Sequence, residues 1–277
     1  MNIVLTSEQQ AVAEKFEEFL NSNSHIFMIK GSAGTGKTTL LKHLVDNIAA
    51  RNIASYLMAP TGRASMILSD KLGDEATTTH RFIYKVAKDK EEVDDDVVFV
   101  LRDNETPDNS IYFVDEASMV SDIEDNDEDV KFGSGRLLKD LISFANCKDS
   151  HRKIVLIGDY AQLPPVGQNF SPALSEEYLR EEYGLTVQTA MLTSVIRQAA
   201  DSGIYKSADA IRKSIDAKLY NQFGLVNSTD VIPFSSEEFI SRYNEAKIMD
   251  GEDEVMIIAP SNAQAMDYNE VIRCNKY

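Results

Sequence analysis

The stretch HIFMIKGSAGTGKTTLLKHLVDNIAA, residues 25–50, decides the fold. Its apolar start, 25–31, predicts a buried strand that stops at a glycine, and 37–50 predicts a helix. Between them GSAGTGKT (31–38) fits the pattern G-x-x-x-x-G-K-[ST], in the strand-to-helix context that this pattern needs. A merely glycine-rich turn would not require these flanking elements. The sequence therefore predicts a phosphate-binding loop.

The residue types of this loop suit the phosphates of a nucleotide. Glycines let backbone N–H groups point inward at phosphate oxygens, and the following helix adds its positive N-terminal dipole. Lys37 would reach the β- and γ-phosphates, and the hydroxyl of Thr38 would bind Mg²⁺. We expect ATP and Mg²⁺ as ligands. The residues expected around the nucleotide are Gly31, Ser32, Ala33, Gly34, Thr35, Gly36, Lys37, Thr38 and Thr39.

Strands and helices alternate on both sides of this loop. Apolar runs predict further strands at 54–60, 110–116 and 152–159. Helical patterns occupy the segments 6–20, 62–72 and 134–146. Strands at this spacing, with helices between them, predict right-handed crossovers and a parallel sheet covered on both faces. The expected fold class is α/β, a P-loop NTPase.

A carboxylate pair follows the apolar run of IYFVDEAS, residues 111–118. Asp115 is suited to hold Mg²⁺ through water, and Glu116 to polarise the attacking water. Alone, such a pair is typical of a strand that leaves the core. Combined with a phosphate loop, it favours hydrolysis over transfer to a second small substrate.

A glutamine occupies a stiff loop in IVLIGDYAQLPPVG, residues 154–167. Gln162 lies between the turn at Asp159 and the prolines 164–165. Because parallel strands deliver their C-terminal ends to one crevice, we expect Asp159 and Gln162 near the γ-phosphate. An amide can hydrogen-bond both that phosphate and the attacking water, so Gln162 is interpreted as a γ-phosphate sensor.

Composition restricts the class of protein. The 277 residues carry a net charge of −17, of which the acidic clusters 89–96 and 122–129 supply −11, so contact with DNA would have to be local. Only two cysteines, Cys147 and Cys274, occur, which favours a reducing compartment. No signal-peptide pattern and no apolar stretch of about 20 residues is present. We expect a soluble cytoplasmic protein without a membrane partner.

Seven motifs occur in the order found in superfamily 1 DNA helicases. The set resembles the RecD/TraA-like branch, which includes the phage Dda helicase, and it extends through nearly the whole chain. This resemblance implies a RecA-like motor domain over 1–198, ATP hydrolysis, and 5′→3′ movement on single-stranded DNA. The motifs are LTSEQQ (5–10), GSAGTGKTT (31–39), APTGRAS (59–65), TTTH (77–80), VDEASM (114–119), GDYAQLPPVG (158–167) and LTSVIRQ (192–198).

The resemblance also assigns roles to single residues. Gln9 matches the glutamine that reads the adenine edge, and Gln162 the coupling glutamine. Arg197 resembles an arginine finger, whose charge would offset that building on the γ-phosphate. A solvated helix arginine is the alternative for Arg197.

Two motifs resemble the segments that grip the DNA backbone. Their hydroxyls, donors and glycine suit contacts that fix position without reading sequence. Thr61 could instead cap the helix 62–72, and His80 could be a buried helix starter. The predicted DNA-binding residues are Pro60, Thr61, Gly62, Arg63, Thr78 and His80, with Asn262 further along the chain.

Residues 84–109 interrupt the alternation, at the place where this branch inserts a small β-hairpin that splits the duplex. Phe99 would meet a base there or form the core of the hairpin. From 199 to 277 helices at 203–215 and 236–249, a strand at 254–260 and a further helix indicate the start of a second RecA-like domain. The last motifs of the family do not follow. We therefore expect an N-terminal fragment that binds nucleotide but turns it over poorly.

Two other classes remain as alternatives. A P-loop kinase or GTPase would need a basic lid or an N-K-x-D guanine signature, and neither occurs. A nucleic-acid-binding module with a vestigial ATPase would need a degraded phosphate site, whereas Lys37, Asp115 and Gln162 are all present. A nucleotide-gated nucleic-acid-binding module without unwinding stays an alternative.

Overall fold

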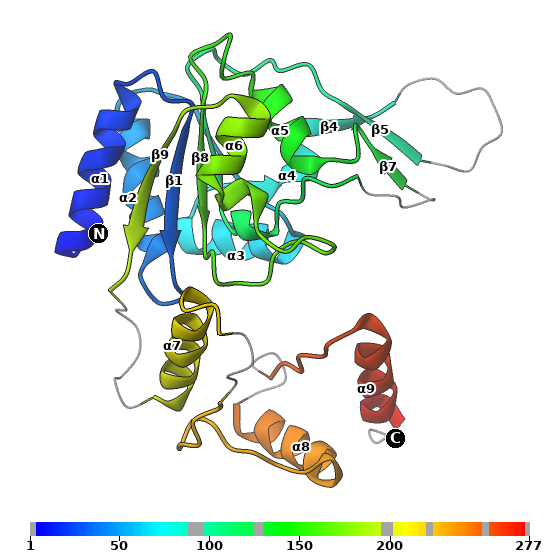
Figure 1. Cartoon of the computed structure of the whole chain (residues 1–277). Helices are drawn as coiled ribbons and strands as arrows, with labels where there is room; N and C mark the ends of the chain where they lie inside the picture. The colour runs from blue at the N-terminus through cyan, green and yellow to red at the C-terminus, as the bar shows by residue number, and fades with distance from the viewer. Residues whose placement is uncertain are drawn as a thin grey trace. The chain divides into compact units, whose positions relative to one another are not determined.

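The computed structural model of the chain describes residues 4–87, 97–124, 130–194, 202–219, 224–250 and 255–274. The chain divides into two compact units, residues 1–198 and 199–277. Figure 1 shows both units coloured along the chain. The assignment of these units to two motor domains stays a prediction.

A six-stranded sheet forms the centre of the first unit, in the order β3-β2-β6-β8-β1-β9. Every pair of neighbours in it runs parallel, which confirms the predicted α/β fold. The edge strands β3 and β9 were not predicted from the sequence. The strands are β1 (Ile26–Gly31), β2 (Ser55–Ala59), β3 (Ala76–Thr78), β6 (Ile111–Val114), β8 (Lys153–Gly158) and β9 (Val187–Leu192).

Helices cover both faces of this sheet, as expected. Successive residues of β1 point to opposite faces: Phe27 and Ile29 join one hydrophobic core, Ile26 and Met28 the other. The first core packs under α1 (Ser7–Leu20), α2 (Lys37–Ala50) and α3 (Gly62–Leu72). The second packs under α4 (Thr79–Ile83), α5 (Leu137–Ala145) and α6 (Glu176–Tyr183). Short 3₁₀ turns occupy Ala117–Met119 and Pro172–Leu174.

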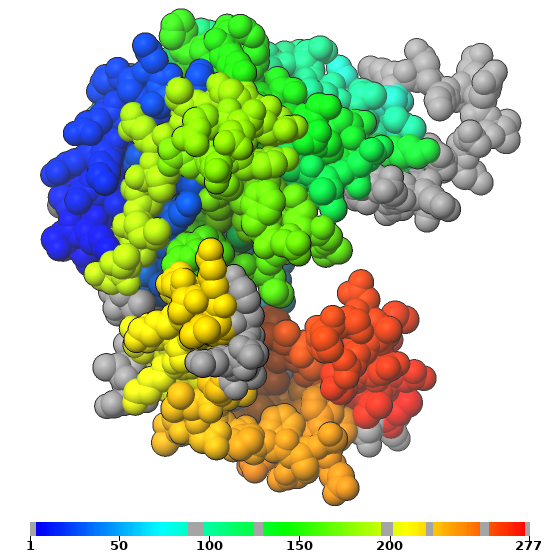
Figure 2. All heavy atoms as spheres, viewed as in Figure 1, coloured from blue at the N-terminus to red at the C-terminus, as the bar shows by residue number. Residues whose placement is uncertain are grey.

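Helix α1 and strand β9, far apart in sequence, lie side by side at the surface of the first unit (Figure 2). One carboxylate joins the ends of these elements. Glu8 accepts hydrogen bonds from the backbone N–H of Thr193 (2.9 Å), the hydroxyl of Thr193 (2.6 Å) and the backbone N–H of Ser194 (2.9 Å). Burial raises the pKa of Glu8, but these hydrogen bonds outweigh it and leave the pKa lowered. Glu8, at the start of α1, thus holds Thr193 and Ser194, which directly follow β9.

A second, three-stranded sheet stands beside the main one (Figure 1). Strand β4 (Tyr84–Val86) pairs antiparallel with β5 (Val97–Leu101), and β7 (Val130–Phe132) pairs parallel with β5. The predicted strand of the 84–109 insertion is therefore present, and β7 is an addition. Phe99 stacks on Phe132 with ring centroids 4.6 Å apart. Its position matches the core alternative.

The second unit holds α7 (Gly203–Asp216), a 3₁₀ turn at Ser236–Glu238, α8 (Phe239–Asp250) and α9 (Asn262–Cys274). The predicted strand at 254–260 is wrong for its described residues, 255–260, because no described segment pairs with them. Over 202–219, 224–250 and 255–274, no hydrophobic side chain is buried. Across all the described parts of the chain, no helix has the length and apolar character needed to span a membrane.

Candidate active site

The phosphate-binding loop joins the C-terminal end of β1 to the start of α2. Gly34 (φ 81°) and Gly36 (φ 79°) adopt the left-handed conformation that favours glycine. The ammonium of Lys37 donates to the carbonyl oxygens of Gly31 (2.7 Å) and Ser32 (3.0 Å). The hydroxyl of Thr35 also donates to Ser32 O (2.8 Å). The positive charge of Lys37 is therefore held against the loop itself, where phosphate oxygens could replace the carbonyls.

Gly31 has no room for a side chain. A Cβ there would lie 2.8 Å from Thr35 Oγ1 and 3.0 Å from the Cβ of Leu192. The loop consequently starts in a niche between its own turn and the edge strand β9. This packing fixes the point at which the backbone leaves the sheet.

The predicted carboxylate pair follows β6, two places from β1 in the sheet. Glu116 has a left-handed backbone (φ 51°), an uncommon conformation for a residue with a side chain. Its buried Oε2 has no hydrogen-bond partner among the residues that the structure describes. Burial and the neighbouring charge of Glu116 raise the pKa of Asp115 to about 6, while the charges of Lys37 and Lys71 oppose this rise.

These groups fit a bound Mg²⁺. Magnesium prefers oxygen ligands and binds through one or two carboxylates, substrate phosphates and several waters. Asp115, an orphaned carboxylate oxygen of Glu116 and the hydroxyl of Thr38 supply that donor set around one cavity. A cation there would relieve the repulsion between the two carboxylates.

A cavity of about 320 Å³ brings together three of the predicted catalytic residues and the predicted magnesium ligand Thr38, while Lys37 is not among its lining residues. Thr38, Asp115, Glu116 and Gln162 line it, opposite side chains of α3. Gln162 N donates to Asp159 O (3.1 Å), and Asp159 is buried where β8 ends. The structure thus collects at one place residues that lie 124 positions apart, from Thr38 to Gln162.

Two other predicted site residues, Gln9 and Arg197, are not among the described residues that line this cavity. Gln9 is buried beside the loop, where its amide accepts from Thr6 N (3.0 Å) and donates to Gly36 O (3.1 Å). Contact with an adenine would require Gln9 to give up at least one of these bonds. Arg197 lies outside the described residues, so its role as an arginine finger stays a prediction.

A larger cavity of about 920 Å³ contains part of the predicted DNA grip. Pro60, Thr61 and His80 line it together with Gln162. The remaining lining is largely apolar and includes Met119, Ile123, Leu163 and Val166. His80 is half-buried, and its ring meets Phe132 edge-on at 4.9 Å between centroids.

Two threonines predicted to contact DNA also cap helices, and for Thr61 this was the alternative interpretation. Thr61 Oγ1 accepts from Ala64 N (3.2 Å) at the start of α3, and Thr78 Oγ1 accepts from Arg81 N (3.1 Å) at the start of α4. Gly62 and Arg63 are exposed in the first turn of α3. Asn262 is the exposed first residue of α9, in the second unit.

Lys71 was missed by the motif analysis. It lies two turns beyond Arg63 on α3 and lines the same cavity as the carboxylates. The available signal was the spacing 63, 67, 71, which places these residues along one side of the predicted helix 62–72. Its charge lowers the pKa of Asp115 against the effect of burial.

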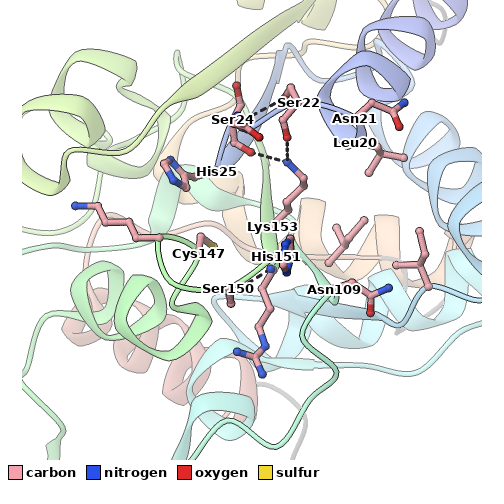
Figure 3. Close-up of a pocket in the computed structure, with 15 residues that line it drawn as sticks. Leu20, Asn21, Ser22, Ser24, His25, Asn109, Cys147, Ser150, His151 and Lys153 are labelled. Carbon is pink, nitrogen blue, oxygen red and sulfur yellow. Dashed lines mark hydrogen bonds between the residues drawn. The ribbon is translucent and has the colours of Figure 1, made fainter.

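A third hollow, of about 470 Å³, lies at the opposite ends of the strands, where β1 and β8 begin (Figure 3). Basic side chains line it, and the protein itself supplies partners for three of them. Lys153 donates to Ser22 O (2.8 Å) and Ser24 O (2.7 Å), and Arg152 to Thr106 O (2.7 Å). His151 pairs with Asp108. These contacts tie loops together, so the hollow is structural.

We expect the folding stability of the chain to depend on pH through His25, which lines this hollow. Burial, and then the charges of Lys148 and Lys153, lower its pKa below the ordinary value. The unfolded chain therefore takes up this proton at a higher pH than the folded chain, and stability is lost as the pH falls from about 6.5. We expect His25→Gln to make the loss of stability between pH 7 and pH 5 shallower. Urea unfolding at several pH values measures it, with His43→Gln as control; equal slopes in all three proteins would contradict the expectation.

The fold and the site together define a P-loop nucleotide-binding domain. A glycine-rich loop follows β1, and a carboxylate pair and a glutamine follow the parallel strands β6 and β8. The chain belongs to the AAA domain family, whose sequence profile matches residues 4–231.

Individual relatives confirm the resemblance to superfamily 1 helicases. The chain is 26% identical to the ATP-dependent RecD2 DNA helicase of Deinococcus radiodurans over 207 residues, which cover 75% of this chain and 24% of that protein. It is 36% identical to the ATP-dependent DNA helicase dda of Enterobacteria phage T4 over 80 residues, 28% of this chain and 18% of that protein. An uncharacterized protein of Acanthamoeba polyphaga mimivirus, R530, is 24% identical over 98% of this chain and 56% of its own length.

The fold is also similar to a structure solved to explain DNA unwinding at forked duplexes by two coordinating Pif1 helicases. The TM-score is 0.52 at 18% identity, over 97% of this chain and 57% of that chain. The chain spans less than two thirds of the length of each of these relatives.

Proposed function

We propose that the chain is the ATP-hydrolysing part of a superfamily 1 DNA helicase of the RecD-like branch, which moves 5′→3′ on single-stranded DNA. One observation carries this proposal. Thr61, Met119 and Gln162 each line both the cavity of the carboxylates and the larger cavity of Pro60 and His80. A structural change at the γ-phosphate would therefore alter the larger cavity, where we expect DNA to bind, through these three shared residues.

The proposed chemistry is hydrolysis of the γ-phosphate by water. Lys37 holds the β- and γ-phosphates, Glu116 accepts the proton of the water, and Gln162 orients that water and senses the phosphate. Bound Mg²⁺, held by Thr38 and Asp115, would neutralise charge on the phosphates. Arg197 would add positive charge in the transition state, and Gln9 would contact the base of the nucleotide.

We further propose that the two units of the chain belong to two different motor domains. Residues 1–198 correspond to a first motor domain, and residues 199–277 to part of a second one. The described residues of the second unit bury no hydrophobic side chain, which supports its being incomplete as a folded body. Motor movement needs two domains that close on ATP and reopen, so we expect this chain alone to hydrolyse ATP slowly and to unwind nothing.

Binding of fluorescent oligo-dT to the whole chain tests the proposal, with and without Mg²⁺ and a non-hydrolysable ATP analogue. We expect a change in DNA affinity of about fivefold or more with nucleotide, within the usual range of coupling between two sites. Lys37→Ala should remove the nucleotide effect. Nucleotide binding without any DNA binding would instead favour a P-loop enzyme of another class. DNA binding that nucleotide gates, without hydrolysis, would favour a binding module.

A further inference from the structure

The loop that carries Gln162 is pressed at its start against the segment that follows the carboxylate pair. A Cβ on Gly158, the last residue of β8, would lie 3.1 Å from Ser118 N and 3.4 Å from Ala117 N. The end of β8 therefore packs closely against the turn after Glu116, and a side chain at residue 158 would be crowded there.

The far end of the same loop touches the same segment again. Gly167 has a left-handed backbone (φ 79°), and a Cβ on it would lie 2.8 Å from Ile123 Cδ1. Next to it, the side-chain oxygen of Gln168 accepts hydrogen bonds from Asp122 N (3.1 Å) and from Ser121 Oγ (3.3 Å). The loop thus spans two anchor points on residues 117–123, with Gln162 between them.

Hydrogen bonds to the side chain of Asp122 stabilise this second anchor point. Its buried carboxylate accepts from Arg136 (3.0 Å), from the hydroxyl of Tyr178 (2.6 Å) and from that of Tyr183 (2.5 Å). Segment 117–123 is therefore fixed to the start of α5 and to both ends of α6 on one side, and to the Gln162 loop on the other. Ile123, one residue further, lines the larger cavity with Thr61 and His80.

We propose that Gln168 is a positioning residue that makes the Gln162 loop and segment 117–123 respond together to the nucleotide. This inference rests on the proposed function, because it needs a nucleotide in the cavity of Asp115 and Glu116. When Gln162 follows the γ-phosphate, the hydrogen bonds of Gln168 carry the displacement to Ser121 and Asp122. The wall of the larger cavity then changes with the state of the nucleotide.

Hydrogen-exchange mass spectrometry of the whole chain tests this, with and without Mg²⁺ and a non-hydrolysable ATP analogue. Two peptides matter: one covers the phosphate loop, 31–40, and the other covers 117–124. We expect nucleotide to slow exchange in both peptides of the unaltered protein. Gln168→Met keeps the length of the side chain but removes the amide oxygen, so the effect at 117–124 should be lost while that at 31–40 stays. Gln168→Glu retains an acceptor oxygen and should restore the effect at 117–124.

The outcomes separate the two proposals. No slowing at 31–40 in the unaltered protein would overturn the proposed function itself. Slowing at 31–40 with equal slowing at 117–124 in the unaltered protein and in Gln168→Met would overturn only the role of Gln168. Loss of the effect in both peptides of Gln168→Met would also overturn it, because the residue would then support nucleotide binding as such.

Discussion

Lys37→Ala is expected to lower the rate of ATP hydrolysis by at least about 10²–10³-fold, the usual loss when one preorganised donor to the transition state is removed. The ammonium of Lys37 is held inside the loop by Gly31 and Ser32, so alanine removes a positive charge from the loop itself. The measurement is the release of inorganic phosphate with oligo-dT present. Binding of a fluorescent nucleotide, measured in parallel, should also weaken.

Lys42→Ala provides the matched control for this variant. Lys42 lies on the same helix and pairs with Asp46 (2.9 Å) and Asp74 (3.0 Å) at the surface. Its loss should leave hydrolysis within a factor of about two, since such surface pairs contribute about 1 kcal/mol or less. Hydrolysis by Lys37→Ala at the rate of the Lys42 variant would place the phosphate chemistry elsewhere.

Glu116→Gln is expected to lower kcat by about 10²–10⁴-fold, the usual contribution of a general base. The amide keeps the size of the side chain but cannot accept the proton of the attacking water. Nucleotide affinity should stay the same or rise, because the variant removes the repulsion that Glu116 exerts on Asp115. The kinetic signature is thus a fall in kcat without a rise in KM.

The exposed carboxylate of Glu105 offers a control for Glu116. Glu105→Gln makes the same chemical change outside the cavity and should leave kcat unchanged. A fall in nucleotide affinity equal to the fall in kcat would show that Glu116 helps to bind the nucleotide rather than to activate water.

The sequence predicted the central strands well because they are buried on both faces and read as continuous apolar runs. The edge strands escaped notice for a related reason. β9 pairs on one side only and mixes buried Ala190 and Leu192 with half-buried and exposed residues. The strand at 254–260 was predicted from apolar character alone, which cannot supply the partner that a strand needs.

Within the candidate site, too, local motifs could be predicted from the sequence, whereas contacts between distant segments could not. The phosphate loop is a local motif, so its nine residues could be named from the sequence. Gln168 contacts Asp122, which lies 46 positions earlier in the chain, and spacing does not reveal such a contact. Gln9 was assigned to an adenine by resemblance, and this role stays a prediction; in the structure its amide takes part in the N-terminal capping box of α1 and donates to Gly36 O.

Strand β1 packs against a hydrophobic core on each face of the sheet, and this limits which mutations the strand can tolerate. Ile26 and Met28 fill one core, Phe27 and Ile29 fill the other, and Gly31 follows directly in its niche. A single inserted residue would exchange both sets of side chains and displace the glycine at the same time. Apolar substitutions in this strand should therefore be tolerated far more often than changes of its length. In a deep mutational scan, the strand would tolerate apolar substitutions but no insertion or deletion.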